Sequence, residues 1–407
     1  MGTSTHHHHH YLFYPPRPLE GDGSPQSQVE KPREVLIYFI PGNPGLIDYY
    51  ESFLSTLRDL LNSSPSSSSA SISSERTSTE PTRFHIYGQD LAGFNDGAHR
   101  EPFTSRRKPH DLEYQIQHCL DGLRRLCNGI GPETGTETET EGSKPPDQNL
   151  GQTQITYDEV LLMGHSVGSY IALELCHRVL KDPDNTLLRL PGSQSSGSTS
   201  NPLPPTPRLD AAVLLFPTIH HIARSPSGWK LDLLRRTPVV GPHAHLVAQG
   251  FLSLWPESAL RWFVSRALGF PPPAAETTAR WLKSRDGVWQ ALHMGMDEMQ
   301  VIGEAQWDDE LWGVDREAQK RAAEGKGIGT GGGEDGPAPR FYFFFGKDDH
   351  WVATHYRDDF IRQRQRHVER TRIVVDESKI PHAFCINHSE TVAEKVHVWV
   401  KEMYGVK

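Results

Sequence analysis

The segment LLMGHSVGSY (161–170) joins a strand-like run to a helix-like run through a turn that contains two glycines. Apolar residues precede the turn without polar alternation, and apolar residues follow it at helical spacing. Gly164 and Gly168 leave room for a cramped backbone, and His165 and Ser166 lie between them. The pattern predicts a nucleophile elbow that presents the Ser166 hydroxyl. A structural serine in a glycine-rich turn is the alternative, since a motif this short occurs by chance.

Runs as apolar as the one before Ser166 recur along the chain. They lack the polar alternation of half-exposed strands, which suits strands buried on both faces of a parallel sheet. Helical patterns lie between them at 49–61, 112–127 and 168–180, and another follows at 391–404. The alternation predicts an α/β fold, with a mostly parallel sheet and helices on both of its faces. The runs are VLIYFI (35–40), FHIY (84–87), EVLLM (159–163), AAVLLF (211–216), RFYFFF (340–345) and RIVV (372–375).

Low-complexity stretches interrupt this pattern without dividing it into separate domains. They are rich in Ser, Thr, Gly, Pro and Glu, a composition that buries too little apolar area to offset the entropy of ordering. Each falls between a helical pattern and the next strand, so they are predicted to be disordered insertions into one domain at 34–407. Residues 1–33, which include a five-histidine tract, are predicted to be a disordered segment, although YLFY (11–14) is a candidate early antiparallel strand. The insertions are 62–82, 131–154, 191–207 and 324–339.

The segment that follows the run at 211–216 is too long for a single crossover helix. Residues 217–320 are therefore predicted to form a helical cap over the C-terminal edge of the sheet. Within it, GFLSLWPESALRWFVSRALGF (250–270) combines aromatic and aliphatic residues with a few charges.

Composition excludes several classes of function. The chain has 407 residues, of which 36% are hydrophobic and 23% charged, as expected for a globular protein with a sizeable core. A net charge of −9, without a basic stripe interleaved with aromatics, argues against nucleic-acid binding. The four cysteines show no CxxC spacing, the acids and histidines show no HExxH spacing, and no phosphate loop is present. We therefore expect reduced thiols, no metal and no cofactor. No apolar run approaches the length of a membrane span.

A serine nucleophile needs a histidine base and an acid that orients it, and in α/β hydrolases these follow in the order Ser, Asp or Glu, His. Asp348 and Asp349 come directly after the run at 340–345, and spacing alone leaves both open as the acid. His382 and His388 come after the last strand-like run. His382 is the better base, because it lies in a loop flanked by apolar residues, whereas His388 fits the start of the last helix.

The turn after the first strand-like run is expected to supply donors for an oxyanion hole. This turn reads IPGNPGLIDYY (40–50), and its two prolines, Pro41 and Pro44, have no N–H to donate. The backbone amides of Asn43 and Val167 are therefore the predicted donors.

Together, several of these segments resemble the lipid droplet-associated hydrolase family. The resemblance implies an α/β-hydrolase fold, a serine esterase-type site, and association with lipid droplets and the endoplasmic reticulum surface. Carried over by position, it makes Ser166 the nucleophile, His382 the base and Asp349 the acid, because the family's glycine-x-x-aspartate spacing runs from Gly346. The matching blocks are IPGNPG…YY, GHSVGSY, LLFPTIHHIARSPSG (214–228), FFGKDDHWV and IPHAF.

The predicted function is a serine hydrolase that cleaves lipid esters, either sterol esters or acylglycerols, through an acyl-enzyme at the droplet surface. One alternative is acyl transfer or thioester hydrolysis at the same site. Another is a droplet-organising surface protein whose hydrolase site is weak or vestigial. Residues 250–270 are expected to lie in the lipid monolayer, to pack on the sheet and line an acyl pocket, or to do both with different side chains.

Overall fold

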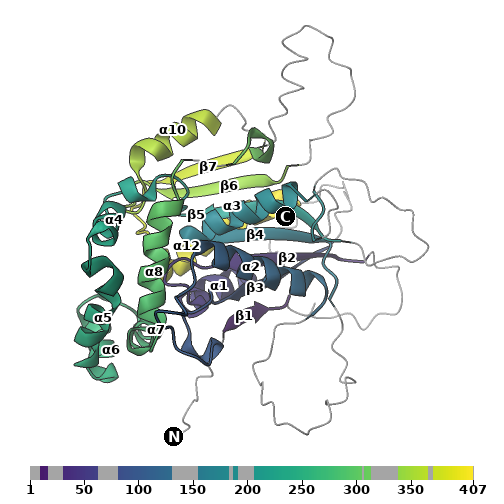
Figure 1. Ribbon diagram of the computed structural model, residues 1–407. Helices are drawn as coiled ribbons and strands as arrows, with labels where there is room; N and C mark the ends of the chain where they lie inside the picture. Colours follow the sequence, from purple (N-terminus) through teal and green to yellow (C-terminus); the bar gives the residue numbers. More distant parts are fainter. Residues whose placement is uncertain are drawn as a thin grey trace, which may run out of the picture.

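A seven-stranded sheet forms the centre of the computed structural model (Figure 1), with the strand order β1-β3-β2-β4-β5-β6-β7. β1 pairs antiparallel with β3, and every other neighbouring pair is parallel. The structure describes residues 10–16, 31–62, 81–130, 155–182, 187–190, 206–304, 307–312, 338–364 and 370–406. The strands are β1 Tyr11–Tyr14, β2 Arg33–Ile40, β3 Thr82–Gln89, β4 Glu159–His165, β5 Arg208–Leu215, β6 Arg340–Gly346 and β7 Thr371–Asp376.

The apolar runs predicted as strands form β2 to β7, and β6 shows why such runs are needed. Phe343 packs against Phe360 on one side of the sheet, with ring centroids 5.0 Å apart. Its neighbour Phe344 packs against Trp399 on the other side, at 5.6 Å. Because successive side chains point to opposite faces and both faces are covered, a polar alternation would bury polar groups without partners. The predicted α/β-hydrolase fold is confirmed.

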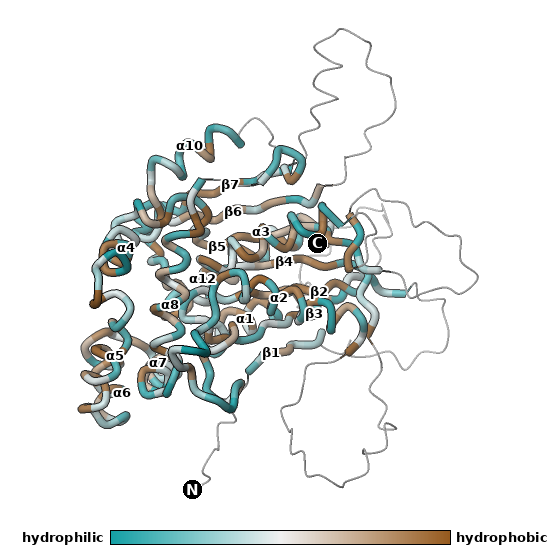
Figure 2. Tube along the Cα trace, viewed as in Figure 1, coloured by the Kyte–Doolittle hydropathy of each residue, from teal (hydrophilic) through white to brown (hydrophobic). Residues whose placement is uncertain are grey.

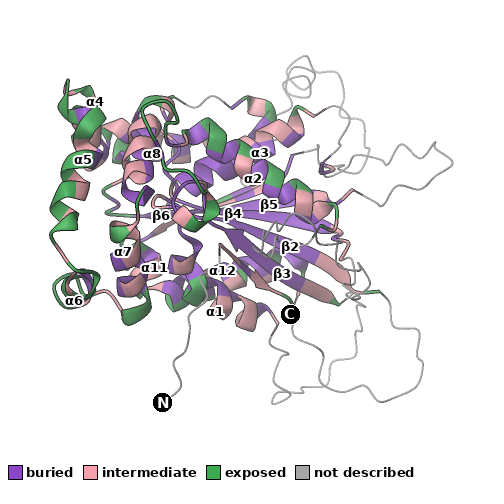
Figure 3. Ribbon diagram, turned by 60° about the horizontal axis from the view of Figure 1, so that its bottom comes forward, coloured by how far each residue is buried: buried purple, intermediate pink, exposed green. Residues whose placement is uncertain are grey.

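Helices cover both faces of the sheet, as Figure 3 shows for α2 and α3 on one face and α1 and α12 on the other. The first pair consists of α2 Leu112–Cys127 and α3 Val167–Leu180, and the second of α1 Glu51–Leu61 and α12 Ser389–Tyr404. The other helical elements outside the cap are η1 Ile47–Tyr50, η2 Asp96–Ala98, η3 Ile222–Arg224, η4 Asp309–Trp312, α10 Thr354–Arg364 and α11 Phe384–Asn387.

The N-terminal strand β1 lies in the segment for which the sequence predicts disorder. YLFY nevertheless forms the antiparallel edge strand that the sequence also allowed, because Tyr11 to Tyr14 pair with Gln89 to Ile86. Tyr11 stacks on Tyr87 of β3, with ring centroids 5.9 Å apart. The insertion at 131–154 lies outside the described residues, as do most of 1–33 and of the insertions at 62–82, 191–207 and 324–339.

A set of helices follows β5 and lies at the end of the sheet where the parallel strands finish (Figure 1). The stretch 250–270 does not form one helix, because α5 ends at Ser253 and α6 begins at Glu257. Pro256 between them has no N–H to donate and disfavours a helical conformation for the residue before it. The cap helices are α4 Gly228–Arg236, α5 Val240–Ser253, α6 Glu257–Arg266, α7 Pro272–Lys283 and α8 Gly287–Val301.

Helices α4, α5 and α6 expose many apolar residues: brown residues occur along them in Figure 2, and much of their length is exposed in Figure 3. Eleven of the fourteen large apolar side chains that are exposed among the described residues lie here. We call them the outer cap surface. They are Trp229, Leu233, Val239, Val240, Leu246, Val247, Phe251, Leu254, Trp262, Phe263 and Leu268.

Candidate active site

Ser166 lies on a sharp turn between the end of β4 and the first residue of α3. Its backbone adopts φ 55° and ψ −124°, a conformation that costs free energy for a residue with a side chain. The Ser166 amide donates to the carbonyl of Leu215 at 3.0 Å, which ties the turn to the end of β5. Ser166 is half-exposed, whereas His165 and Val167 beside it are buried. The turn therefore presents the hydroxyl at the C-terminal edge of the sheet.

The two glycines of the turn are required by close backbone approach. A Cβ atom on Gly164 would lie 2.2 Å from the carbonyl oxygen of Gly168. A Cβ atom on Gly168 would lie 2.3 Å from the carbonyl oxygen of Ile40 in β2. Both distances are far below van der Waals contact with rigid backbone, so only glycine lets α3 start this close to the strands.

The structure brings Ser166, His382 and Asp349 together from three segments of the chain. The Ser166 hydroxyl lies 2.8 Å from His382 Nε2, and His382 Nδ1 lies 2.7 Å from Asp349 Oδ2. A carboxylate only accepts, so His382 Nδ1–H donates to Asp349 and leaves the Nε2 lone pair for the serine proton. Ser166 comes after β4, Asp349 after β6 and His382 after β7. The C-terminal ends of these parallel strands meet at one edge of the sheet.

The two neighbouring acids that spacing alone left open differ clearly in their environments. Asp348 is exposed, whereas the Asp349 side chain is 1% exposed and contacts His382. Burial by itself would raise the pKa of Asp349. The charge and hydrogen bond of His382, together with the Trp351 amide that donates to Oδ1 at 2.9 Å, outweigh burial and hold that pKa below its ordinary value. Asp349 is therefore an ionised acceptor that fixes the imidazole.

Arg357 of α10 fixes the loop that carries Asp349. Its buried guanidinium donates from Nη1 to the carbonyls of Gly346 at 3.1 Å and of Lys347 at 2.9 Å. The other candidate base, His388, is the N-cap residue of α12, where the sequence placed it.

The turn predicted to complete an oxyanion hole lies directly against Ser166. A Cβ atom on Gly42 would lie 3.1 Å from Ser166 Cβ, so the backbone of this turn borders Ser166. The Gly42 amide is already used, since it donates to the Tyr50 hydroxyl at 3.0 Å. Among the described residues, the amides of Asn43 and Val167 donate to no protein acceptor. Both remain available to a ligand, which is the condition for the predicted role.

His165 connects this turn to the base through a buried chain of hydrogen bonds. Its Nε2 donates to the carbonyl of His382 at 2.9 Å, which leaves Nδ1 as an acceptor for the Tyr50 hydroxyl at 2.7 Å. Burial and the neighbouring His382 lower the pKa of His165 to about 3, so its ring is neutral. The network links Gly42, Tyr50, His165 and the backbone of His382, and it holds the two halves of the site in register.

The side chain of Asn43 reaches the cap rather than the nucleophile. Its Nδ2 donates to the carbonyl of Ala291 at 3.1 Å and to Oε1 of Glu298 at 3.0 Å, both on α8. Burial raises the pKa of the Glu298 carboxyl to about 8, although the hydrogen bond from Asn43 acts in the opposite direction.

Sequence reasoning missed Tyr50, Arg357 and Glu298. Tyr50 belongs to the block IPGNPG…YY, so a signal for it existed. Nothing in the sequence distinguishes Arg357 or Glu298 from the exposed charges of a helix.

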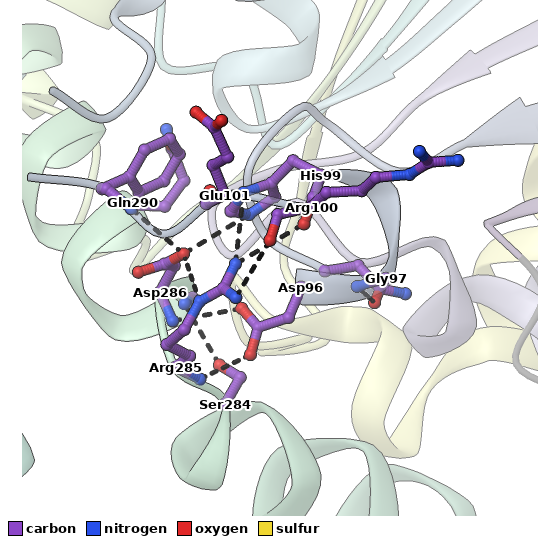
Figure 4. A network of polar contacts seen from close by, with 12 residues as sticks. Asp96, Gly97, His99, Arg100, Glu101, Ser284, Arg285, Asp286 and Gln290 are labelled. Carbon is purple, nitrogen blue, oxygen red and sulfur yellow. Dashed lines mark hydrogen bonds and ion pairs between the residues drawn. The ribbon is translucent and has the colours of Figure 1, made fainter. Parts of the chain in front are cut away.

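One cluster of metal-binding residue types occurs in the described part of the chain, where ligand atoms of Asp96, His99 and Asp286 lie within 4.8 Å of one another. Figure 4 shows that the Arg285 side chain enters this cluster, and its Nε donates to Asp286 Oδ2 at 2.9 Å. Backbone amides of Arg285 and Asp286 donate to the Asp96 carboxylate. The guanidinium already supplies the compensating charge, so these residues do not fit a metal site. They fasten the loop after β3 to the start of α8.

Comparison with known proteins gives consistent matches along the chain. The family described as lipid-droplet associated hydrolase matches residues 33–385. The lipid droplet-associated hydrolase of Mus musculus is 23% identical over 388 residues, which cover 92% of this chain and 87% of that protein. Its namesake in Drosophila melanogaster is 20% identical and covers 91% of this chain and 90% of its own. Among solved structures, the peroxisomal α/β-hydrolase Lpx1 of Saccharomyces cerevisiae aligns with a TM-score of 0.48 and 8% identity, over 98% of this chain and 89% of its own.

Proposed function

Because this chain belongs to the lipid-droplet associated hydrolase family, we propose that it is a serine hydrolase that cleaves lipid esters at the surface of lipid droplets. The continuous hydrogen-bond chain from Ser166 through His382 to Asp349 carries this proposal. A serine hydroxyl is a weak nucleophile until a histidine takes its proton, and the acid fixes the tautomer that can do so.

The reaction follows from the donors and acceptors at the site. Ser166 Oγ attacks the ester carbonyl while its proton moves to His382 Nε2, and the imidazolium is stabilised by Asp349. The negative charge on the carbonyl oxygen is held by the amides of Asn43 and Val167, aided by the positive end of α3. His382 then protonates the leaving alcohol, and water attacks the acyl-enzyme to release the acid and regenerate Ser166. These steps need neither a metal nor a cofactor.

Fluorophosphonate labelling tests the nucleophile directly. The probe forms an adduct with an activated serine, so the wild-type protein should be labelled and the Ser166→Ala variant should not. Absence of a serine-dependent adduct on well-folded protein would support the alternative that the site is vestigial and the protein organises droplets. If the adduct forms, p-nitrophenyl esters of rising chain length test the preference for lipid substrates. Activity confined to acetate argues against sterol esters and acylglycerols.

Acyl transfer and thioester hydrolysis are the enzymatic alternatives, because the same acyl-enzyme can be attacked by another nucleophile. Product analysis separates them from ester hydrolysis. An acyl product formed only with an added alcohol or thiol acceptor would favour acyl transfer, and a preference for acyl-thioesters would favour a thioesterase.

The outer cap surface supports the proposed location at a lipid monolayer. Exposed apolar side chains that gather in one region mark sites of contact with membranes, partners or ligands. The segment 228–268 also carries five Lys and Arg residues and two acids, in a chain whose net charge is −9. Basic residues around an apolar surface favour anionic phospholipid headgroups. None of the described helices is long and apolar enough to cross a membrane. On the exposed apolar side chains and basic residues of α4 to α6, a larger region than 250–270, we propose attachment through these helices, with the endoplasmic reticulum surface as a second location.

A further inference from the structure

Glu298 is a fully buried acid on the cap helix α8 that the proposed reaction does not use. It lies on the same face of α8 as Ala291 and Gly295, because Gly295 is four residues and Glu298 seven residues after Ala291. The Asn43 side chain packs directly against Gly295, since a Cβ atom there would lie in van der Waals contact, 3.4 Å, with Asn43 Nδ2. This face of α8 therefore forms a seat for one side chain, that of Asn43.

The hydrogen bonds in this seat have fixed directions. The Ala291 carbonyl can only accept, so the group that faces it must be the amide NH₂ of Asn43. Both hydrogens of that NH₂ are then used, one on Ala291 and the other on Glu298 Oε1. Glu298 Oε1 consequently accepts, and the carbonyl oxygen of a neutral acid keeps this acceptor.

The Asn43 turn is held from the opposite side by Tyr50, which accepts from the Gly42 amide at 3.0 Å. Backbone and side chain of two successive residues are thus anchored to different parts of the protein, Gly42 to η1 and Asn43 to the cap. We propose that Glu298 is a positioning residue that holds the Asn43 amide in the oxyanion hole by anchoring its side chain to α8. This inference rests on the proposed function, in which Asn43 donates to the oxyanion.

Protonation of Glu298 matters because the group lies beside a site where negative charge develops. Burial raises the pKa of Glu298 to about 8, and the neighbouring Asp297 acts in the same direction. The acid is therefore neutral at neutral pH, and it ionises as the pH rises through about 8. A buried carboxylate there opposes a second negative charge on the substrate oxygen, so activity should fall on the alkaline side.

Other charges near α8 are engaged with partners of their own. On α8, Asp297 accepts from the Leu112 amide at 2.9 Å, and burial lowers the pKa of His293. Ion pairs hold the charges on three of the elements packed against α8: Asp232 with Arg235 on α4, Arg280 of α7 with Asp48, and Glu113 of α2 with Arg178. On the other two, His245 of α5 stacks on Trp289, and the guanidinium of Arg224 in η3 lies over the Tyr356 ring.

Two substitutions separate anchoring from charge. Glu298→Gln keeps an oxygen that accepts from Asn43 and removes the titration, whereas Glu298→Leu removes the anchor. Glu257→Gln makes the same chemical change at an exposed acid of the cap and serves as the matched control. The measurements are kcat and KM for p-nitrophenyl butyrate and the fluorophosphonate labelling rate, from about pH 6 to about pH 9.5, with Ser166→Ala as the blank.

The wild type and Glu257→Gln should lose activity above about pH 8, and Glu298→Gln should lack that fall. Glu298→Leu should lower kcat by roughly 10²-fold with little change in KM, because a displaced oxyanion donor costs about that much. The kcat of Glu298→Gln at neutral pH should stay close to that of the wild type, because glutamine keeps the acceptor for Asn43. If Glu298→Leu does not fold, as judged by circular dichroism, the pH profile of Glu298→Gln decides.

An alkaline fall in Glu298→Gln equal to that of the wild type would overturn the inference, as would a folded Glu298→Leu with wild-type kcat. In either case the wild type would still be labelled at Ser166. Absence of Ser166-dependent labelling in the wild type is a different result, and it would overturn the proposed function itself.

Discussion

The turn around Ser166 and the outer cap surface differ in which kind of side chain is buried and which is exposed to water. At the turn, polar groups are buried and paired: His165, Asp349 and His382 are each less than 9% exposed, and each has a hydrogen-bond partner on both sides of its side chain. At the outer cap surface, apolar groups face solvent, with Trp262 66% and Leu254 79% exposed. The buried hydrogen bonds fix the positions of the side chains around Ser166, whereas the exposed apolar side chains of the cap have an unfavourable hydration free energy.

The difference indicates which forces stabilise each region. Burial of apolar area contributes about 25 cal/mol per Å², so the strands stabilise the fold while the outward side chains of α4 to α6 contribute little. Exposed apolar surfaces of this kind mark contact with membranes or partners, which is the basis of the proposed attachment. Helix α8 packs against α4 and also anchors Asn43, so it joins the two regions.

The largest effect is expected from the acid that orients the base. Asp349→Asn should lower kcat by roughly 10⁴-fold, because an amide in place of the carboxylate favours the wrong tautomer of His382. Asp348→Asn, the same change at the exposed neighbour, should leave activity near that of the wild type. Steady-state hydrolysis of p-nitrophenyl butyrate measures both. Loss of activity in Asp348→Asn with a fully active Asp349→Asn would reverse the assignment.

Stability should distinguish the strands from the outer cap surface. Phe344→Ala should lower the free energy of unfolding by about 3–5 kcal/mol, because it leaves a cavity between β6 and α12. Trp262→Ala should change it by less than about 0.5 kcal/mol, because that ring is mostly in solvent. Urea denaturation of both variants provides the comparison. A large loss of stability in Trp262→Ala would mean that the outer cap surface is packed in solution, and it would remove the argument for an interface.

Lipid binding should show the converse pattern. A triple variant with Phe251→Ser, Trp262→Ser and Phe263→Ser should bind vesicles of phosphatidylcholine and phosphatidylserine with an affinity lowered by about 10²-fold or more. The reason is that each large apolar side chain contributes about 1.5–3 kcal/mol when buried. Hydrolysis of a short soluble ester should not change. Co-sedimentation with the vesicles measures binding at low and high salt. The control replaces Ile130 and Val398, which are exposed outside the cap, by serine. Equal binding by the two variants would contradict attachment through α4 to α6.

The sequence was sufficient for the sheet and for the order of the site residues, because both depend on local patterns. Six apolar runs predict six strands, and the glycines around Ser166 predict the turn whose close contacts require them. The choice between Asp348 and Asp349 was beyond spacing, because a loop can turn either side chain inward. Whether these residues are catalytic stays a prediction.

The sequence was insufficient where distant segments meet. Glu298 is an ordinary residue of a helical pattern, and only the approach of the turn after β2 makes it a buried acceptor. The sequence treats 250–270 as one segment, yet the break at Pro256 divides it into the last residues of α5 and the whole of α6. Their exposed apolar side chains add to those of α4. Contacts between elements far apart in sequence leave no periodic signal.

The last prediction concerns the pH dependence of stability and the buried acid that joins the two regions. Because burial raises the pKa of Glu298 from 4.5 to about 8, the folded protein holds a proton between these values that the unfolded chain releases. Its contribution to stability is therefore fully present below about pH 4.5 and declines as the pH rises towards 8. The melting temperature of Glu298→Gln relative to the wild type should therefore rise steadily across this window. Glu257→Gln, at the exposed face of the cap, should show no such trend in differential scanning calorimetry. A difference between Glu298→Gln and the wild type that is constant with pH would mean that Glu298 is not a buried neutral acid, and it would remove the reason to expect an alkaline fall in activity.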